Sequence, residues 1–290
     1  MRQLLLCTDL DRTLLPNGEQ AESPRAKELF ERLVGREDVT LAYVTGRHRG
    51  LIEQAIQEYD LPLPDFAIGD VGTTIYQVSA SGLPSGLPSG LPSDWTSWSD
   101  WQEHLSASWP VVNTELLKSQ LQTFLELTLQ EAEKQNRFKI SFYVQFDLDS
   151  TRLTQLKSTV QERTAQHELD ANLIWSVDQE NRVGLLDILP VKANKLKAIE
   201  YLMQRHNFQI QDTLFAGDSG NDMDVFRSNI PSVLVANAEP EIKRWALERD
   251  IENLYVASGN LFELNGNYRA GILEGACHYW PEARQWLKNS

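Results

Sequence analysis

An apolar run at the start of the chain ends in two aspartates, and this pattern limits the possible folds more than any other. Residues 4–7 read Leu-Leu-Leu-Cys, and Asp9 and Asp11 follow with one residue between them. So short an apolar run predicts a buried strand of a parallel sheet. Because ligands of open α/β sheets bind beyond the carboxyl ends of the strands, both carboxylates are expected at that edge. Two such charges need a cation or a proton between them, so the pattern indicates a site for magnesium and phosphate.

Strand-like and helix-like segments alternate in the first and last parts of the chain. The expected order is helix 24–34, strand 39–44, helix 51–59 and strands 66–68 and 74–78 in the first part, and helix 193–206, strand 213–216, helix 223–228 and strand 232–235 in the last. The remainder is expected to form one or two helices. This rhythm predicts an α/β fold with a parallel, doubly wound, Rossmann-like sheet.

The middle of the chain has a different character. Residues 81–93 repeat Ser-Gly-Leu-Pro three times, which predicts a flexible or polyproline-like linker, or the tip of an inserted hairpin. A helix, a strand, a second helix and two strands are expected next, at 116–133, 138–144, 153–165, 172–177 and 184–188. This order predicts an inserted α+β domain. The expected division is the first part of the core (1–80), the linker (81–93), the cap (94–191) and the second part of the core (192–290).

Four tryptophans lie close together where the expected cap begins: Trp95, Trp98, Trp101 and Trp109. Aromatic rings can stack on sugars. A spacing of three residues, however, is more typical of a helix stripe that packs into a core. We therefore expect these side chains to be buried in a core rather than to bind a ligand.

The charge and the cysteine content exclude several classes of partner. The 290 residues carry a formal net charge of −14, which argues against nucleic acid and anionic membranes, since both require a basic surface. A phosphorylated small molecule stays open, because a metal ion and a few local cations can bind one phosphate. Cys7 and Cys277 are expected to be reduced thiols of a cytoplasmic protein. Neither a signal peptide nor a membrane segment is expected.

The two N-terminal aspartates are suited to nucleophilic and acid–base catalysis. Asp9 is expected at the end of the first strand, where its carboxylate could attack phosphorus in line and form an aspartyl phosphate. Asp11, two residues further on, points to the same side of an extended chain. There it could protonate the leaving alkoxide and later activate water.

Three more segments at strand ends or helix starts offer further parts of a phosphoryl-transfer site. The hydroxyl of Thr45 and the backbone around Gly46 suit a phosphate oxygen at a helix start. Lys195 offers a cation for the phosphate and for the nucleophile, and Asp218 and Asp222 offer the hard oxygen ligands that Mg²⁺ prefers. Taken singly, these segments are compatible with a helix N-cap, a solvated lysine and an acidic turn. Together and in this order they indicate one active site.

These segments resemble the motifs of the haloacid dehalogenase (HAD) superfamily of phosphatases, over residues 1–78 and 192–290. The resemblance implies that Asp9 is the nucleophile, that Asp11 is the general acid and base, and that Mg²⁺ is the cofactor. The implied metal ligands are Asp9, Asp11 through its backbone carbonyl, Asp218 and, in support of the metal shell or of Lys195, Asp222. The implied phosphate- and substrate-binding residues are Thr45, Gly46, Arg47, Lys195 and Asn221. The α+β insertion resembles the type-II cap of the sugar phosphatases.

Within the superfamily, the chain resembles the sucrose-phosphate phosphatases. The segments that fit this family are 1–6, 41–47, 139–141, 194–195, 217–222 and 270–274. Two residues depart from the pattern: Arg12 stands where the superfamily mostly has a small or polar residue, and Thr74 where an acidic residue is expected. Lys139, on a cap strand expected to face the core, is the candidate for sugar binding, because specificity depends on contacts beyond the phosphate.

The sequence therefore predicts a Mg²⁺-dependent phosphoric monoester hydrolase that converts sucrose 6-phosphate to sucrose and phosphate, as in sucrose biosynthesis. One alternative is a phosphatase for mannosylfructose, glucosylglycerol, mannosylglycerate or trehalose phosphate. Others are a phosphomutase of the same superfamily and a non-catalytic scaffold, against which the intact aspartates argue. A sugar phosphate is the expected small-molecule partner, and the sugar-phosphate synthase of the same pathway is a candidate protein partner.

Overall fold

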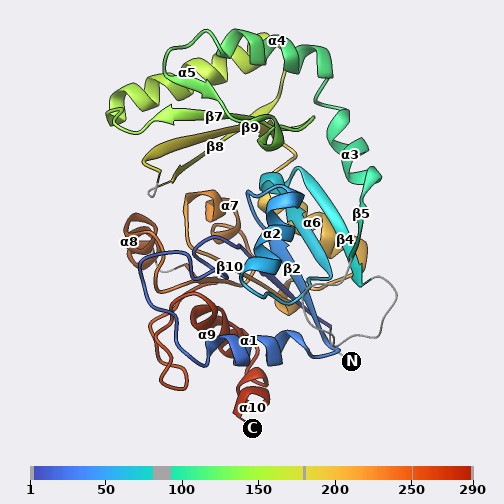
Figure 1. The fold of residues 1–290 in the computed structure, drawn as a ribbon, viewed down its shortest axis with the longest axis vertical. Coiled ribbons are helices and arrows are strands. Elements are labelled where there is room, and N and C mark those ends of the chain that lie inside the picture. Colours follow the sequence, from blue (N-terminus) through green and yellow to red (C-terminus); the bar gives the residue numbers. More distant parts are fainter. Residues whose placement is uncertain (1–2, 81–92, 179–180, 250, 289–290) are drawn as a thin grey trace.

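Two β-sheets organise the computed structural model of the chain, the larger one below and the smaller one above it in Figure 1. The structure describes residues 3–80, 93–178, 181–249 and 251–288. The Ser-Gly-Leu-Pro repeat lies outside the described residues up to residue 92. No helix in the described ranges is both long enough and apolar enough to cross a bilayer.

The larger sheet has eight strands in the order β12-β11-β10-β1-β2-β3-β4-β5. Its parallel strands are β1 (Leu4–Thr8), β2 (Val39–Val44), β3 (Phe66–Gly69), β10 (Thr213–Gly217), β11 (Ser232–Leu234) and β12 (Leu254–Val256). All five residues of β1 are buried, as its apolar run predicts. The strand order changes direction between β1 and β10, where open α/β sheets bind their ligands. The expected doubly wound parallel sheet is thus confirmed.

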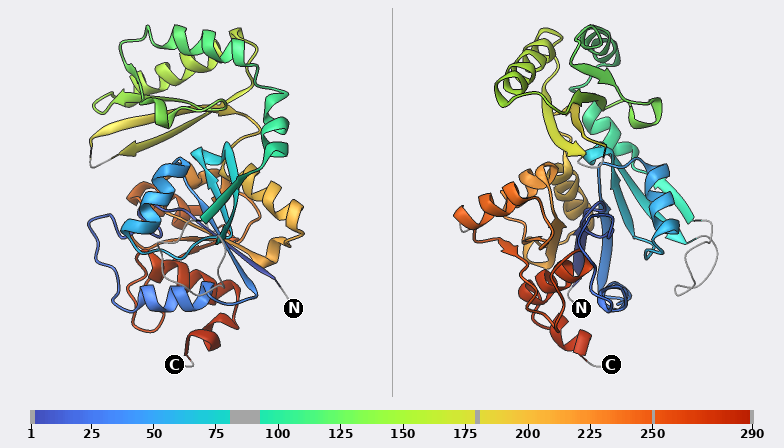
Figure 2. Two further views of the ribbon diagram at one scale, coloured as in Figure 1. Left: turned by 45° about the vertical axis from the view of Figure 1, so that its right-hand side comes forward. Right: turned by 60° about the vertical axis from the view of Figure 1, so that its left-hand side comes forward.

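Helices cover both faces of the larger sheet (Figure 2). They are α1 (Ala26–Val34), α2 (Arg49–Glu58), α6 (Lys195–His206), α7 (Met223–Phe226), α8 (Pro240–Arg249), α9 (Arg269–Tyr279) and α10 (Ala283–Lys288). In α1, the buried residues recur every three or four positions, at Ala26, Leu29, Phe30 and Leu33. This apolar stripe is what lets α1 pack on β2 and α9.

The smaller sheet and two helices form the cap. Its antiparallel strands, in the order β6-β7-β9-β8, are β6 (Leu127–Leu129), β7 (Ile140–Gln145), β9 (Val183–Pro190) and β8 (Ala171–Asp178). The helices α4 (Val111–Leu121) and α5 (Ser150–Gln166) lie on the outer face of this sheet, so its other face is turned to the larger domain (Figure 1). The buried apolar residues of β7 alternate, at Ile140, Phe142 and Val144, while the buried Ser141 between them is polar. This period of two is what a sheet with one apolar face requires.

The prediction of one helix over residues 116–133 is wrong for the second half of that range. Helix α4 ends at Leu121, and Leu127 pairs with Val144 in the sheet. That pairing buries Leu127, so tertiary contacts override the helical spacing of the local sequence. Strand β12 is a further element that the sequence does not predict. It has three residues, too few to carry a periodic pattern.

The tryptophans are buried, as expected, but most of their contacts are with the larger domain. Trp95 lies on β5 (Ser93–Ser97), which pairs with β4 (Thr74–Ala80) at the edge of the larger sheet. The cap boundary expected at residue 94 therefore falls inside a strand of that sheet. Trp98 precedes α3 (Ser99–Ser106), and its ring stacks on His206 of α6 at 5.7 Å. All four tryptophans are at most 9% exposed.

Candidate active site

Polar residues follow four neighbouring strands of the larger sheet, and three of these residues are expected site residues. Asp9 comes directly after β1, Thr45 after β2, Asp70 after β3 and Asp218 after β10. These strands run parallel and are neighbours in the sheet, so their carboxyl ends meet at one edge. The chain thereby brings together polar groups that lie more than two hundred residues apart in sequence.

Three buried carboxylates and one buried lysine form the centre of this edge. Oxygens of Asp9, Asp218 and Asp222 lie within 4.8 Å of one another. Lys195 Nζ lies 3.0 Å from Asp9 Oδ1 and 2.7 Å from Asp222 Oδ1. Each of these four residues is at most 4% exposed. Arg12 Nε lies 3.5 Å from Asp218 Oδ2. Three carboxylates against this guanidinium and one ammonium still leave an excess of negative charge away from water, which a bound divalent cation would neutralise.

The pKa values in this cluster reflect that excess. Burial raises the pKa of Asp9 to about 7, although the charge of Lys195 opposes the rise. Burial, together with the charges of Asp9 and Asp222, raises the pKa of Asp218 well above its usual range. Burial acts to lower the pKa of Lys195, but the charges of Asp222 and Asp9 outweigh it and raise that pKa. The ammonium is therefore retained, and the carboxylates favour a further positive charge.

Asp222 holds the cluster in place through both of its oxygens. Its Oδ2 accepts the N–H groups of Asp218 at 3.0 Å and Ser219 at 3.2 Å, while Oδ1 accepts Lys195 Nζ. A Cβ on Gly217 would lie 2.5 Å from Oδ2, so only glycine fits beside this carboxylate. Of the two roles expected for Asp222, these contacts favour orienting Lys195. Asp218 Oδ2, by contrast, has no hydrogen-bond partner among the described residues.

Asp11 lies beside the cluster and is paired with Arg47. The guanidinium donates from Nε to Oδ2 at 2.8 Å and from Nη2 to Oδ1 at 2.6 Å, and Asn17 Nδ2 donates to Oδ1 at 2.8 Å. Burial acts to raise the pKa of Asp11, but the hydrogen bonds and charge of Arg47 outweigh it and lower that pKa. Asp11 is therefore an ionised carboxylate here, and Arg47, expected to bind phosphate or substrate, contacts Asp11.

The loop after β3 closes against the Thr45 segment. The N–H of Val71 donates to the carbonyl of Thr45 at 3.0 Å, and that of Asp70 donates to the carbonyl of Arg47 at 2.9 Å. Asp70, Val71 and Gly72 all have positive φ, of 51°, 59° and 99°. A Cβ on Gly72 would lie 2.3 Å from the carbonyl oxygen of Asn194, just before α6. The loop thus joins the Thr45 segment to the segment that carries Lys195.

The same loop connects the larger domain to the cap. Lys139, just before β7, faces this domain as expected, and its Nζ lies 2.9 Å from Asp70 Oδ1, with both side chains at most 6% exposed. Asn136 Nδ2 donates to Thr73 Oγ1 at 2.9 Å. Thr74, the departure noted in the sequence, donates through Oγ1 to Asp70 Oδ2 at 3.3 Å. The cap is therefore joined to the site edge by one buried ion pair and one hydrogen bond between side chains.

The remaining expected residues also lie at this edge. Thr45 is 1% exposed, and its Oγ1 accepts the N–H of Arg47 at 3.2 Å beside Gly46. Asn221 Oδ1 accepts Lys195 Nζ at 2.9 Å, so Asn221 orients the lysine. Sequence reasoning missed Asp70, although it follows the apolar run of β3 as Asp9 follows that of β1. The strand-end rule that identified Asp9 would have found Asp70 too.

A family model described as sucrose-6F-phosphate phosphohydrolase matches residues 2–280 of this chain. A putative HAD-like hydrolase from Nitrosococcus oceani is 48% identical over 99% of this chain and 74% of its own length. Mannosylfructose-phosphate phosphatase from Agrobacterium fabrum is 25% identical over 95% of this chain and 96% of its own length. The chain spans 52–60% of the length of the matching sucrose-phosphatases from Nicotiana tabacum and Arabidopsis thaliana.

A solved structure gives a similar result. The sucrose-phosphatase from Synechocystis sp. PCC6803, solved in complex with sucrose and phosphate, has a TM-score of 0.75 and 29% identity, covering 96% of this chain and 98% of its own. A HAD subclass IIB sugar phosphatase, BT4131, has a TM-score of 0.54 at 13% identity, over 88% of this chain and 93% of its own, and shows the fold alone. The expected core with an inserted type-II cap is thus found in solved structures.

Proposed function

We propose that this chain, which belongs to the sucrose-6F-phosphate phosphohydrolase family of HAD phosphatases, hydrolyses a phosphorylated disaccharide, with sucrose 6-phosphate as the leading substrate. The observation that carries the proposal is the buried cluster of Asp9, Asp218, Asp222 and Lys195 at the sheet edge under the cap. A phosphate monoester complements this cluster, because a metal ion and a lysine there could neutralise its charge.

Asp9 is the proposed nucleophile. Its carboxylate is held at the end of β1 by Lys195, and its own N–H donates to the carbonyl of Ala216 at 2.9 Å. In-line attack by Asp9 on phosphorus would break the bond to the sugar oxygen and form an aspartyl phosphate. Water would then hydrolyse this intermediate and release inorganic phosphate. The buried ion pair supports this role because it keeps the carboxylate oriented before substrate arrives.

Asp11 is the proposed general acid and base. To protonate the sugar oxygen it must first gain a proton, which the pairing with Arg47 disfavours. We therefore propose that Arg47 exchanges Asp11 for the phosphate when substrate binds, since guanidinium groups bind phosphate in the same two-pronged manner. Loss of that pair would raise the pKa of Asp11 and allow it to carry the proton. It would later take a proton from the attacking water.

Mg²⁺ is the proposed cofactor. The side chains of Asp9 and Asp218 and the backbone carbonyl of Asp11 would hold it, with Asp222 in support through Lys195. When bound, Mg²⁺ would neutralise the charge between the nucleophile and the phosphate. The buried Asp218 Oδ2 supports this assignment, because it accepts no hydrogen bond from the described residues and has Arg12 Nε only at 3.5 Å, so it remains open to a hard cation.

We place specificity for the sugar on the cap face. Lys139 is the proposed sugar contact, and it would reach the sugar only when its buried pair with Asp70 opens. Among the alternatives, the similarity to a mannosylfructose-phosphate phosphatase favours a second candidate, a phosphatase for that disaccharide phosphate. A phosphomutase would return the phosphoryl group to the sugar. These candidate activities differ in the sugar that is bound or in the group that receives the phosphate. Attack by Asp9 is common to all of them.

A panel of sugar phosphates tests the proposal by release of free phosphate. We expect the highest kcat/KM with sucrose 6-phosphate, compared with mannosylfructose, glucosylglycerol, mannosylglycerate and trehalose phosphates. The Asp9→Asn variant should release no phosphate above background while keeping its circular dichroism spectrum, and Asp147→Asn, at an exposed position, should match the wild type. Near-normal turnover in Asp9→Asn would refute the mechanism. A phosphosugar isomer in place of free phosphate would indicate a mutase.

A further inference from the structure

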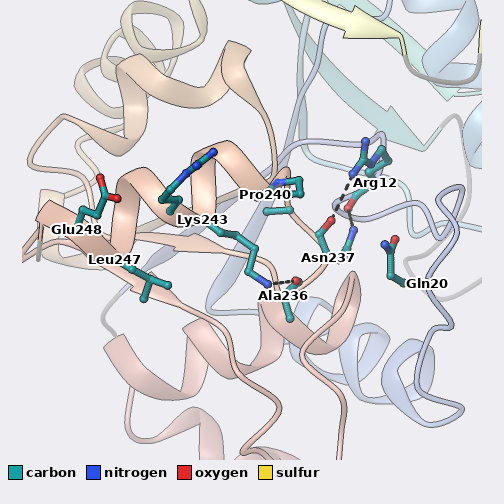
Figure 3. Close-up of a pocket in the computed structure, with 10 residues that line it drawn as sticks. Arg12, Gln20, Ala236, Asn237, Pro240, Lys243, Leu247 and Glu248 are labelled. Atoms are coloured by element: carbon teal, nitrogen blue, oxygen red, sulfur yellow. Dashed lines mark hydrogen bonds between the residues drawn. The ribbon is translucent and has the colours of Figure 1, made fainter. Parts of the chain in front are cut away.

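A cavity of about 630 Å³ opens beside the candidate active site, and the proposed reaction does not use it (Figure 3). It lies between α8 and the segments that contain Arg12 and Gln20. Its floor includes the loop after β11, with Ala236 and Asn237. This loop leaves the same edge of the sheet that carries Asp9 and Asp218, so the cavity and the site are neighbours. The volume is within the range of small-molecule sites, about 300–1,000 Å³.

The cavity is basic in a strongly acidic chain. Its charged lining residues are Arg12, Lys243, Arg244 and Glu248, three cations against one carboxylate. The chain as a whole has a formal net charge of −14. Within the described residues, neither Lys243 nor Arg244 has a carboxylate oxygen within 4.0 Å. A local excess of unpaired positive charge on such a protein attracts an anion.

A hydrogen bond to the loop after β11 fixes the position of the Lys243 ammonium. Lys243 Nζ donates to the carbonyl oxygen of Ala236 at 2.7 Å, which directs the ammonium toward the loop after β11 (Figure 3). An ammonium has three donors, so two remain for a ligand. Arg244, the next residue on α8, has no hydrogen-bond partner among the described residues and offers its whole guanidinium. The two side chains leave successive positions of α8, which point in different directions, so they line different parts of the cavity.

Arg12 links the cavity to the acid cluster. Its Nε lies 3.5 Å from Asp218 Oδ2, and its Nη2 donates to the carbonyl of Asn237 at 3.4 Å. Asn237 Nδ2 in turn donates to the carbonyl of Arg12 at 2.6 Å. Arg12 has a φ of 57°, a left-handed conformation that costs a non-glycine residue energy. The guanidinium thus offsets part of the charge of Asp218, and the side chain also borders the cavity.

We propose that this cavity binds a phosphate group, either free phosphate or the phosphoryl group of a small metabolite, with Lys243 as a direct ligand and with Arg12 and Arg244 adding positive charge at its border. Ammonium and guanidinium donors form charge-assisted hydrogen bonds with phosphate oxygens. A bound phosphate competes with Asp218 for the Arg12 guanidinium. Occupancy of the cavity therefore strengthens binding of a divalent cation at Asp218, and by linkage the cation strengthens binding of the phosphate. This coupling rests on the metal role proposed for Asp218, whereas the anion site itself does not.

Calorimetric titration of the metal-free protein with inorganic phosphate, in the presence of a chelator, tests the site alone. Without metal, the excess negative charge around Asp9 disfavours phosphate in the active site, so the cavity is expected to give the binding signal. Lys243→Gln/Arg244→Gln should bind at least tenfold more weakly than the wild type. The control Lys197→Gln/Lys288→Gln, which removes two positive charges from exposed positions, should bind normally. Equal affinity in both double variants, or no saturable binding to the wild type, overturns the proposal.

Two further titrations identify the source of the phosphate and test the coupling between phosphate binding and Mg²⁺ binding. Glucose 6-phosphate in place of phosphate should bind more tightly if the ligand is a phosphorylated metabolite, and no more tightly if it is free phosphate. Mg²⁺ titrations with and without phosphate should show a several-fold gain in Mg²⁺ affinity that is larger in the wild type than in Lys243→Gln/Arg244→Gln. An equal gain in both proteins overturns the coupling through Arg12. The metal-free titration keeps its meaning even if the chain proves not to be a phosphatase.

Discussion

At the level of single residues, the orientation of Lys195 depends on Asp222. This carboxylate accepts two backbone N–H groups and the ammonium. An asparagine at this position would have one oxygen, so its amide nitrogen would face either the N–H groups or Lys195. We expect Asp222→Asn to lower kcat/KM about 100-fold through misplacement of the lysine. Kinetics with sucrose 6-phosphate check this, with Asp147→Asn as the control. Unchanged kinetics would show that Asp222 does not position Lys195.

Gly72 is a second residue at which the structure permits only one residue type, because no Cβ fits there. An alanine there would combine a φ of 99° with a Cβ 2.3 Å from the carbonyl oxygen of Asn194. We expect Gly72→Ala to lower the free energy of unfolding by about 2 kcal/mol or more. It should also lower activity, because the start of α6 carries Lys195. Denaturant unfolding measures the first effect, and Gly50→Ala, where the nearest contact is the half-buried side chain of His48, serves as the control. Equal stability of the two variants would contradict this prediction.

The residue types at the site could be predicted from sequence, but not their pairings. Asp9, Thr45 and Asp218 each follow an apolar run, and parallel strands place such residues at one edge. Whether Arg47 contacts phosphate or Asp11 depends on the direction of a long side chain, which no local pattern specifies. The same applies to Lys139, because Asp70, its partner, becomes a neighbour only when the cap folds onto the core.

Among the elements, the junction between β7 and the loop after β3 depends on a buried ion pair. Removing one partner leaves an uncompensated charge, so Lys139→Met should destabilise the chain by about 3–5 kcal/mol. The double variant Lys139→Met/Asp70→Asn should recover part of that loss, since the unpaired charge of Asp70 is gone, although the buried carboxylate of Asp187 still loses the nearby charge of Lys139. A double-mutant cycle on the exposed pair Lys197–Glu200 serves as the control. Its coupling free energy should be at most about 1 kcal/mol. A Lys139–Asp70 coupling as small as that of the exposed pair would contradict a buried junction.

Elements with a strong period could be predicted, and elements that depend on pairing could not. The burial pattern of α1 and the apolar run of β1 follow directly from the sequence. Strand β6 does not, because its three residues are stabilised by β7 rather than by their own pattern. The same holds for β5, whose tryptophan-rich segment resembles a helix stripe. Its pairing with β4 places it in the larger sheet instead.

Over the whole molecule, the chain folds around buried negative charge, and this determines how it should respond to metal. The pKa of Asp218 is raised, so its ionised form costs folding free energy at neutral pH in the absence of a cation. Asp218→Asn removes that cost and should make the metal-free protein more stable than the wild type. It also removes a proposed ligand, so Mg²⁺ should stabilise the variant far less.

Asp218→Asn should therefore be more stable than the wild type without metal and less stable than the wild type with Mg²⁺. At a Mg²⁺ concentration one hundred times its Kd, the wild type should gain about 2.7 kcal/mol. Thermal unfolding with a chelator and then with excess Mg²⁺ measures both states, and Asp147→Asn should follow the wild type in each. If Asp218→Asn is instead less stable than the wild type without metal, the charge of Asp218 in the wild type is already compensated within the fold. Arg12 alone would then suffice as the counter-ion of Asp218.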